Sequence, residues 1–347
     1  MADIRVKNIY HMIAYAFQSL HNIGFDNVAS ENFDNIHDLF SAILSCGVGT
    51  QVKRGLHRDY IRNEEPLAGL RGQIKVAETI KQQTLSQGKL VCSYDDFSPD
   101  FPHNQILKSI MLLLLRHGNV KDKNKKALRK LLLNFSEVTE VTSSEIRWDL
   151  LKFHRNNSSY RMLIGICRLV VKGLLLTTEK GMYKLATWLQ DEEMHRLYEK
   201  FVLSYYLRHH PEFLPKAAFI NWDISDSEKS AYLPIMKSDI TMQNGNRRLI
   251  IDTKYYQQTM KINSHDSQKY ISSNLYQIYT YVKNTDKGAT GNVAGVLLYA
   301  KTDEAISPNE DIIIGGNKIS LKTLDLNCDW NIITAQLERL CEWLDDV

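Results

Sequence analysis

The sequence lacks the features that mark secreted, membrane-spanning and nucleotide-hydrolysing proteins. Its 347 residues include only five cysteines, an odd number with no C-x-x-C spacing, which argues against a disulfide framework or a zinc knuckle. No apolar run is long enough to span a bilayer, and the first residues lack the apolar core of a signal peptide. No G-x-x-x-x-G-K-[ST] loop is present, so nucleotide hydrolysis is not expected of this chain. We expect a cytoplasmic protein with no membrane partner, whose cysteines are small core residues.

Charge is unevenly distributed along the chain, although the net charge is only +3. Residues 1–185 contain 26 Lys and Arg against 18 Asp and Glu, a net charge of +8, whereas residues 186–347 contain 17 against 22, a net charge of −5. The basic part could hold DNA or dock on an acidic partner. Its densest cluster runs from Lys121 to Lys130, and we favour an ordinary solvated helix face for it.

The most informative segment is a predicted β-hairpin that carries two aspartates. The apolar run 249–251 has the character of a buried strand, and it leads directly into Asp252 and Lys254, which alternation places on one face. The Asn-Gly pair in 244–246 predicts a turn, so the preceding strand should bring Asp239 alongside. A two-residue loop puts Asp239 on the face of Asp252, and a three-residue loop reverses that face.

This arrangement resembles the PD-(D/E)xK nuclease superfamily. The resemblance implies that Asp239 and Asp252 bind Mg²⁺, with help from the Thr253 carbonyl, because oxygen ligands suit that ion. Lys254 would orient the attacking water or help to deprotonate it. Taken alone, however, Asp-x-Lys is more often a strand that ends in solvated charges.

Two predicted helices add supporting residues to this site. Gln277 and Tyr281 form a Gln-x-x-x-Tyr pattern typical of the helix after the catalytic strand in RecB-like nucleases, and their spacing places them on one helix face. The alternative is that this is only a core helix. Glu199 lies in an amphipathic segment that matches the first helix of the superfamily, which often carries an acidic residue near the metal. The alternative for Glu199 is a solvated side chain paired with Arg196 or Lys200.

The chain is long enough for two domains, and we place the boundary at 177–181. Residues 1–185 are expected to form a mostly helical α+β domain that docks on a partner, with a small β-rich element within Gln51–Val76. Residues 186–347 are expected to form an α/β domain with a mixed central sheet flanked by helices, in the order helix, three strands, helix, strand. The helices predicted from apolar periodicity are Val6–Leu20, Asn35–Ile43, Asn104–Leu115, Lys125–Phe135, Tyr160–Leu175, Glu192–Leu207, Ser267–Lys283 and Trp330–Leu344. The strands expected in the second domain are Ala217–Trp222, the two hairpin strands and Asn292–Ala300.

A closer resemblance covers nearly the whole chain. The segments that carry it are Val6–Ala16, Arg54–Leu56, Gly69–Ile74, Asp239, Asp252–Tyr256, Asn274–Gln277 and Asn292–Tyr299. Several separated motifs in one order are more specific than Asp-x-Lys, and they are similar to the McrC family, the endonuclease subunits of McrBC restriction systems. Gln257–Ser273 shows no pattern that we can match, which leaves His265, Asp266 and Lys269 without roles.

The resemblance implies a partner and a substrate. McrC proteins act with McrB, a hexameric AAA+ ring that hydrolyses GTP and recognises modified cytosine in double-stranded DNA, and the N-terminal domain of McrC inserts into the ring and stimulates hydrolysis. This chain is thus expected to be a Mg²⁺-dependent DNA endonuclease subunit, with GTP hydrolysed by the partner. Two alternatives stay open: a non-cleaving adaptor of an AAA+ ring, and a free-standing RecB-like nuclease.

Overall fold

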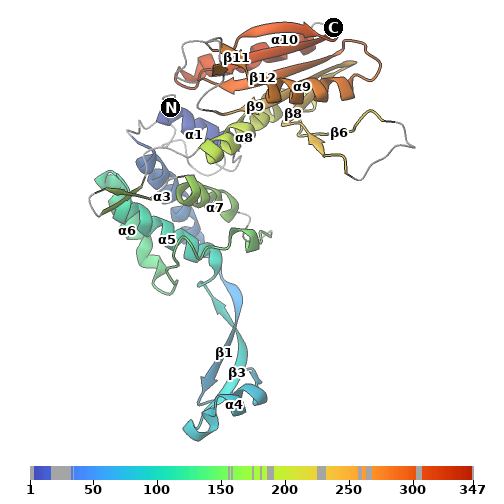
Figure 1. Cartoon of the computed structure of the whole chain (residues 1–347). Helices are drawn as coiled ribbons and strands as arrows, with labels where there is room; N and C mark the ends of the chain where they lie inside the picture. The colour runs from blue at the N-terminus through green and yellow to red at the C-terminus, as the bar shows by residue number, and fades with distance from the viewer. Residues whose placement is uncertain are drawn as a thin grey trace. The chain divides into compact units, whose positions relative to one another are not determined.

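The structure is a computed structural model that describes residues 4–16, 33, 35–154, 157, 159–173, 176–179, 182–185, 191–224, 232–256, 260–262, 268–301 and 307–345 (Figure 1). These residues form two compact units. The first, here the sheet unit, contains helix α1 (Val6–Ala16) and the chain from α8 (Asp191–His209) onwards. The second, here the arm unit, contains the elements from α3 (Ile36–Arg54) to β5 (Met182–Leu185). Within the described residues no helix is both long and apolar enough to cross a membrane.

The sheet unit is built on a five-stranded mixed sheet with the strand order β13-β14-β12-β9-β8. Its central strands β9, β12 and β14 are parallel, and the edge strands β8 and β13 are antiparallel to their neighbours. The mixed sheet flanked by helices confirms the predicted α/β class. The strands are β8 (Ile240–Asn244), β9 (Arg247–Lys254), β12 (Val293–Ala300), β13 (Glu310–Ile314) and β14 (Asn317–Leu324).

Helix α9 (Ser272–Thr285) covers one face of this sheet, and Figure 1 shows it running alongside β12. The helix lies close because β12 carries Gly295 at the contact. A Cβ atom at this position would lie 2.7 Å from Cγ1 of Ile278 and 2.8 Å from Cγ2 of Val282, closer than carbon atoms pack. The absence of a side chain therefore sets the distance between α9 and the sheet.

Helix α10 (Trp330–Asp345) covers the other face. It buries an apolar stripe at helical spacing, formed by Ile333, Leu337, Cys341 and Leu344. Helix α8 joins it through Tyr206, whose buried hydroxyl donates to the carbonyl of Leu337 at 2.9 Å. The helices predicted for these segments are confirmed.

Two strand assignments differ from the sequence-based prediction. The segment predicted as strand Ala217–Trp222 contains only the two-residue strand β6 (Phe219–Ile220), which pairs with β7 (Met236–Lys237) and not with the five-stranded sheet. The prediction that it belongs to the central sheet is therefore wrong. Strands β13 and β14 were not predicted and supply the far edge of the sheet instead. A further pair, β10 (Met260–Ile262) and β11 (Gln268–Tyr270), forms a small separate sheet.

The arm unit combines a helical bundle with a long antiparallel arm. Strands β1 (Asp59–Leu67) and β3 (Leu90–Ser98) pair along their full length and extend from the bundle, with α4 (Val76–Lys81) near the far end of the arm (Figure 1). A short β2 (Gln73–Ile74) pairs with β3, so β3 is central in the three-stranded sheet. The predicted β-rich element is thus present, although its longest partner strand lies beyond the predicted range.

The bundle consists of α3, α5 (Pro102–His117), α6 (Asp122–Leu132) and α7 (Tyr160–Arg168), as apolar periodicity predicts. The buried carboxylate of Asp38 joins α3 to the start of α6, because it accepts hydrogen bonds from the Lys121 backbone N–H and the Asn124 side chain. The lysines of α6 are mostly exposed. The short elements are η2 (Thr84–Gln87), η3 (Leu133–Phe135), η4 (Trp148–Leu150), the π turn η5 (Leu169–Gly173), β4 (Leu176–Glu179) and, in the sheet unit, η6 (Pro211–Phe213).

The division between the two units lies after Thr187, near the predicted limit at residue 185. Of the boundary segment expected at 177–181, residues 177–179 belong to β4, which pairs with β5. Helix α1 belongs to the sheet unit and not to a domain 1–185. The physical reason is a set of buried contacts: the Asn8 side chain donates to the carbonyls of Leu326 and Cys328, at 2.8 and 2.9 Å, and His11 stacks on Trp330.

The membership of α1 in the sheet unit can be tested with Asn8→Ala. Removal of the Asn8 amide leaves two carbonyls without their donor, so the sheet unit should lose about 1–3 kcal/mol of unfolding free energy. The matched control is Lys7→Ala, an exposed neighbour on the same helix, which should change the stability by no more than about 0.5 kcal/mol. Chemical denaturation followed by tryptophan fluorescence measures both variants. Equal stability of the two variants would contradict the assignment.

Candidate active site

The β8–β9 hairpin brings the two predicted aspartates together. Its loop is the two-residue Gly245-Asn246, with Asn244 paired to Arg247, and Gly245 adopts a φ of 54°, as the first position of such a tight turn requires. Ile240 pairs with Ile251, so the same register places Asp239 opposite Asp252. The hairpin and its two-residue loop are confirmed, and the two aspartates lie at the same level of the sheet.

Asp252 is a carboxylate buried at the centre of the sheet unit, with 2% of its surface exposed. Its Oδ2 atom lies 2.6 Å from Nζ of Lys254, in an ion pair, and among the described residues Oδ2 has no other partner. Burial raises the pKa of Asp252 to about 6, the charge of Lys254 opposes that rise and Asp239 adds to it. Such a carboxylate is incompletely compensated by the protein, which is the situation that a bound cation relieves.

Asp239 is half-buried and is held by the strand opposite to it. Its Oδ2 accepts hydrogen bonds from the backbone N–H of Thr253 at 2.7 Å and from the Thr253 hydroxyl at 2.8 Å. Neither bond uses Oδ1. The Thr253 side chain thus orients Asp239, a role that the sequence did not indicate for it.

Lys254 connects the aspartates to helix α9. Its ammonium group donates to Oε1 of Gln277 at 3.0 Å, and the Gln277 amide donates to the hydroxyl of Tyr281 at 2.9 Å. Burial lowers the pKa of Lys254, but the adjacent Asp252 carboxylate outweighs that effect, so the pKa is raised and the amine stays charged. Gln277 and Tyr281 therefore lie on one face of α9, with Gln277 against Lys254.

Helix α8 contributes Glu199 and a residue that the sequence analysis missed, His195. Burial raises the pKa of Glu199, and the charge of Asp239 raises it further, which indicates that Glu199 lies near the aspartates. The predicted alternative of pairing with Arg196 does not occur, since Arg196 pairs with Glu192 and Glu193.

His195 accepts a hydrogen bond from the Tyr255 backbone N–H at 3.4 Å, directly after β9. Burial lowers its pKa and the charge of Asp239 opposes this, so the imidazole is neutral at neutral pH. His195 and Glu199 are four residues apart and share a helix face. That spacing was the signal that could have identified His195.

The donor set fits a divalent cation. Asp239 and Asp252 offer carboxylate oxygens at the same level of the hairpin, and Oδ2 of Asp252 contacts only the Lys254 ammonium group. Glu199 of α8 is near enough that, besides burial, their charges raise its pKa, although the three carboxylates are not gathered within 4.8 Å of one another. Hard cations such as Mg²⁺ prefer these ligands. Of the three residues left without roles, Lys269 is exposed on β11, and His265 and Asp266 lie outside the described residues.

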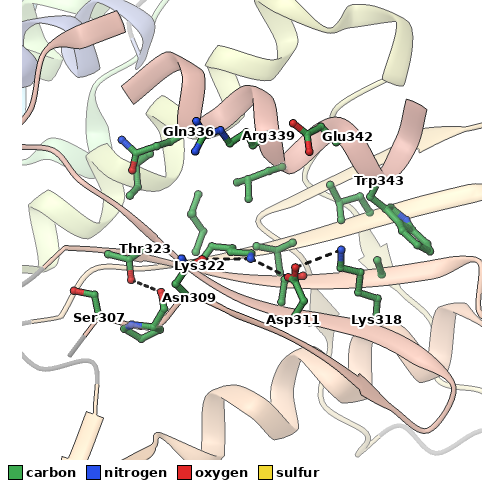
Figure 2. Close-up of a pocket in the computed structure, with 18 of the residues that line it drawn as sticks. Ser307, Asn309, Asp311, Lys318, Lys322, Thr323, Gln336, Arg339, Glu342 and Trp343 are labelled. Carbon is green, nitrogen blue, oxygen red and sulfur yellow. Dashed lines mark hydrogen bonds and ion pairs between the residues drawn. The ribbon is translucent and has the colours of Figure 1, made fainter. Parts of the chain in front are cut away.

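A separate cavity of about 650 Å³ lies on the opposite face of the sheet, beneath α10. Figure 2 shows Arg339, Glu342 and Trp343 of α10 above it, and Lys318 and Lys322 on either side of Asp311 below. The two lysines lie 3.6 and 3.0 Å from the Asp311 carboxylate, so much of their charge is neutralised. Because residues alternate along β9, the cavity lies on the Leu249 face and the aspartates on the other.

Comparisons with known proteins identify the family of this chain. The family model for the McrBC 5-methylcytosine restriction system component matches residues 3–300. The Type IV methyl-directed restriction enzyme EcoKMcrBC of Escherichia coli (strain K12) is 29% identical over 337 residues, which cover 96% of each chain.

Two solved assemblies also contain similar chains. One is the Thermococcus gammatolerans tetradecameric assembly of McrB AAA+ hexamers with bound McrC, with 16% identity, a TM-score of 0.48, and coverage of 96% of this chain and 76% of the other. The other is the T. gammatolerans McrBC complex, with 18% identity, a TM-score of 0.40 and coverage of 58% of each chain. The match to the family model spans most of the sequence. This chain therefore belongs to the McrBC 5-methylcytosine restriction system component family.

Proposed function

We propose that this chain is the DNA endonuclease subunit of a modification-dependent restriction complex, with its active site at Asp239, Asp252 and Lys254. The observation that carries the proposal is the chain of contacts from Asp252 through Lys254 to Gln277, with Asp239 held by Thr253 at the same level of the hairpin as Asp252. A structural ion pair alone would not require a second carboxylate in register with the first.

Each residue has a role that follows from its contacts. Asp239 and Asp252 would hold Mg²⁺, with Glu199 and the Thr253 carbonyl beside them. The ion would supply charge neutralisation at the scissile phosphate and a more acidic water. Lys254 stays charged, and its three N–H groups can serve Asp252, Gln277 and the attacking water at once. Tyr281 fixes the Gln277 amide and so the direction of the ammonium group.

The partner is proposed to be a GTP-hydrolysing AAA+ ring, as in the solved assembly of McrB hexamers with bound McrC. The arm of the arm unit is the surface that fits a protein partner. Large apolar side chains are exposed along it and at its far end: Tyr60, Leu70, Val76, Ile80, Leu85 and Phe97. Exposed apolar residues gathered on one element are typical of an interaction site. Modified cytosine in double-stranded DNA would be recognised by the ring, because this chain contains no recognisable DNA-reading motif.

The metal ligands can be tested by isosteric substitution. Asp239→Asn and Asp252→Asn remove a negative charge while keeping the shape of the side chain, so each should lower DNA cleavage by the reconstituted complex at least about 100-fold. Asp311→Asn, a carboxylate on the opposite face of the sheet, is the matched control and should cleave normally. Magnesium-dependent plasmid cleavage measures all three. Wild-type rates in both aspartate variants would leave the adaptor as the better interpretation.

Substitution of Lys254 or Gln277 should lower the rate of cleavage without weakening metal binding. Lys254→Met keeps the length and burial of the side chain but removes the charge, so turnover should fall by at least about 100-fold while Mn²⁺ still binds. Gln277→Leu should have a smaller effect, about tenfold, because it removes only one acceptor from the lysine. Calorimetry with Mn²⁺ and single-turnover cleavage give the two readouts. Loss of metal affinity in Lys254→Met would assign that residue to ion binding.

The arm can be tested through the GTPase activity of the ring. Leu70→Asp combined with Ile80→Asp places charges on the exposed apolar surface of the arm, so stimulation of GTP turnover should be largely lost. Leu133→Asp changes an equally exposed leucine elsewhere in the arm unit and should stimulate normally. Both variants should keep the metal affinity of the wild type. Efficient cleavage of unmodified DNA without any ring would instead support a free-standing nuclease.

A further inference from the structure

A second cluster of metal-ligating side chains lies in the arm unit, away from the aspartates. Each of His57, Asp59 and His154 offers one ligand atom, and these atoms all lie within 4.8 Å of one another. Within the described part of the chain, no other group of three His, Cys, Asp or Glu side chains comes this close. His57 and Asp59 stand two residues apart at the start of β1, and His154 belongs to the segment that leads to α7.

The backbone of His57 is held firmly by buried residues. Its N–H donates to the Tyr160 hydroxyl at 3.1 Å, and its carbonyl accepts from the Asn104 side chain at 3.0 Å. The Tyr160 hydroxyl in turn donates to the Asn104 side chain at 2.9 Å, which closes the network. The His57 ring also meets Phe101 edge to face, with 5.1 Å between ring centres. This imidazole is therefore pre-positioned, as a metal ligand must be.

The imidazoles of the cluster have unused nitrogen atoms. Nε2 of His57 is buried and has no hydrogen-bond partner, and the His154 ring lies 5.6 Å from the His57 ring, centre to centre. Burial lowers the pKa of His57, while Asp59 opposes that shift and His154 adds to it.

His103 is a third neutral imidazole beside the cluster. It is 4% exposed, and both of its ring nitrogens are buried without a hydrogen-bond partner. Burial lowers its pKa to about 4, and the charges of His57 and His154 contribute, which indicates that the three rings are neighbours.

We propose that His57, Asp59 and His154 form a second metal site, for a transition-metal ion such as Zn²⁺, at the base of the arm. Two imidazoles and one carboxylate suit Zn²⁺ and its neighbours in the first transition series, whereas Mg²⁺ prefers oxygen ligands. Tetrahedral Zn²⁺ at 2.0–2.2 Å from each ligand requires ligand atoms about 3.4 Å apart. Asp59 and His154 are exposed, so their side chains can rotate to close the remaining gap.

The location gives the site a consequence for the arm. An ion would join the first residues of β1 to the segment before α7, which packs on α5 in the bundle. It would thereby restrict the direction of the arm relative to the bundle. This role is independent of the nuclease proposal, since none of its residues contributes to the aspartate site.

The test is a Zn²⁺ titration by calorimetry of the full chain carrying Asp239→Asn and Asp252→Asn, so that the aspartate site does not contribute. One equivalent should bind, and Co²⁺ in its place should give the visible absorption bands of a four- or five-coordinate ion with nitrogen ligands. Adding His154→Ala should weaken Zn²⁺ binding by more than about tenfold, the loss that even outer-sphere partners of a metal can cause. His117→Ala, at the end of α5 in the same unit, is the matched control and should bind normally.

Asp59→Asn is a second test variant that should fold normally, because Asp59 is exposed and the asparagine oxygen can still accept from the Tyr60 backbone N–H. This variant should also lose affinity while its circular dichroism stays unchanged. The absence of Zn²⁺ binding, or equal binding by the His154→Ala, Asp59→Asn and His117→Ala variants, would overturn the proposal.

Discussion

The interaction on which the sheet unit depends is the ion pair of Asp252 with Lys254, because both groups are taken almost completely out of water. Two buried charges cost several kcal/mol each to desolvate, and their attraction offsets this only when further partners complete the network. Asp252 has one such partner and keeps a raised pKa, whereas Lys254 has a second partner in Gln277. The pair is therefore satisfied on the lysine side and unsatisfied on the aspartate side. This asymmetry points to an ion.

The centre of the sheet unit could be predicted from sequence because its signals are local. The alternation along 249–254, the Asn-Gly turn and the i, i+4 spacing of Gln277 and Tyr281 each depend on a few neighbouring residues. The sequence left the loop at two or three residues, and the register followed once the structure gave a two-residue loop. The catalytic roles of these residues stay a prediction, although the structure does bring the side chains together.

The features that could not be predicted depend on contacts between distant segments. Strand β13 is a five-residue, mostly exposed edge strand that begins with Glu310 and Asp311, so its pattern resembles that of a loop. Strand β14 is eight residues long and mostly buried, but Lys318 and Lys322 interrupt its apolar pattern. The place of α1 is decided by Asn8, whose partners lie more than 300 residues away, and no periodicity within α1 reveals them. For His195 the sequence offers only its i, i+4 spacing from Glu199, and its contact with the Tyr255 backbone depends on β9 lying beside α8.

The glycine at the contact between α9 and β12 has a consequence for the chemistry of the sheet unit. Gly295 pairs with Ile250, two residues before Asp252, and the helix turn that it admits carries Ile278, the neighbour of Gln277. A larger residue at 295 would lift this turn away from the sheet and stretch the hydrogen bond between Gln277 and Lys254. The two aspartates, which belong to the hairpin alone, would keep their positions. The length of the hydrogen bond between Lys254 and Gln277 is thus set by a core position that has no polar side chain. The site can therefore be altered without substituting any charged residue.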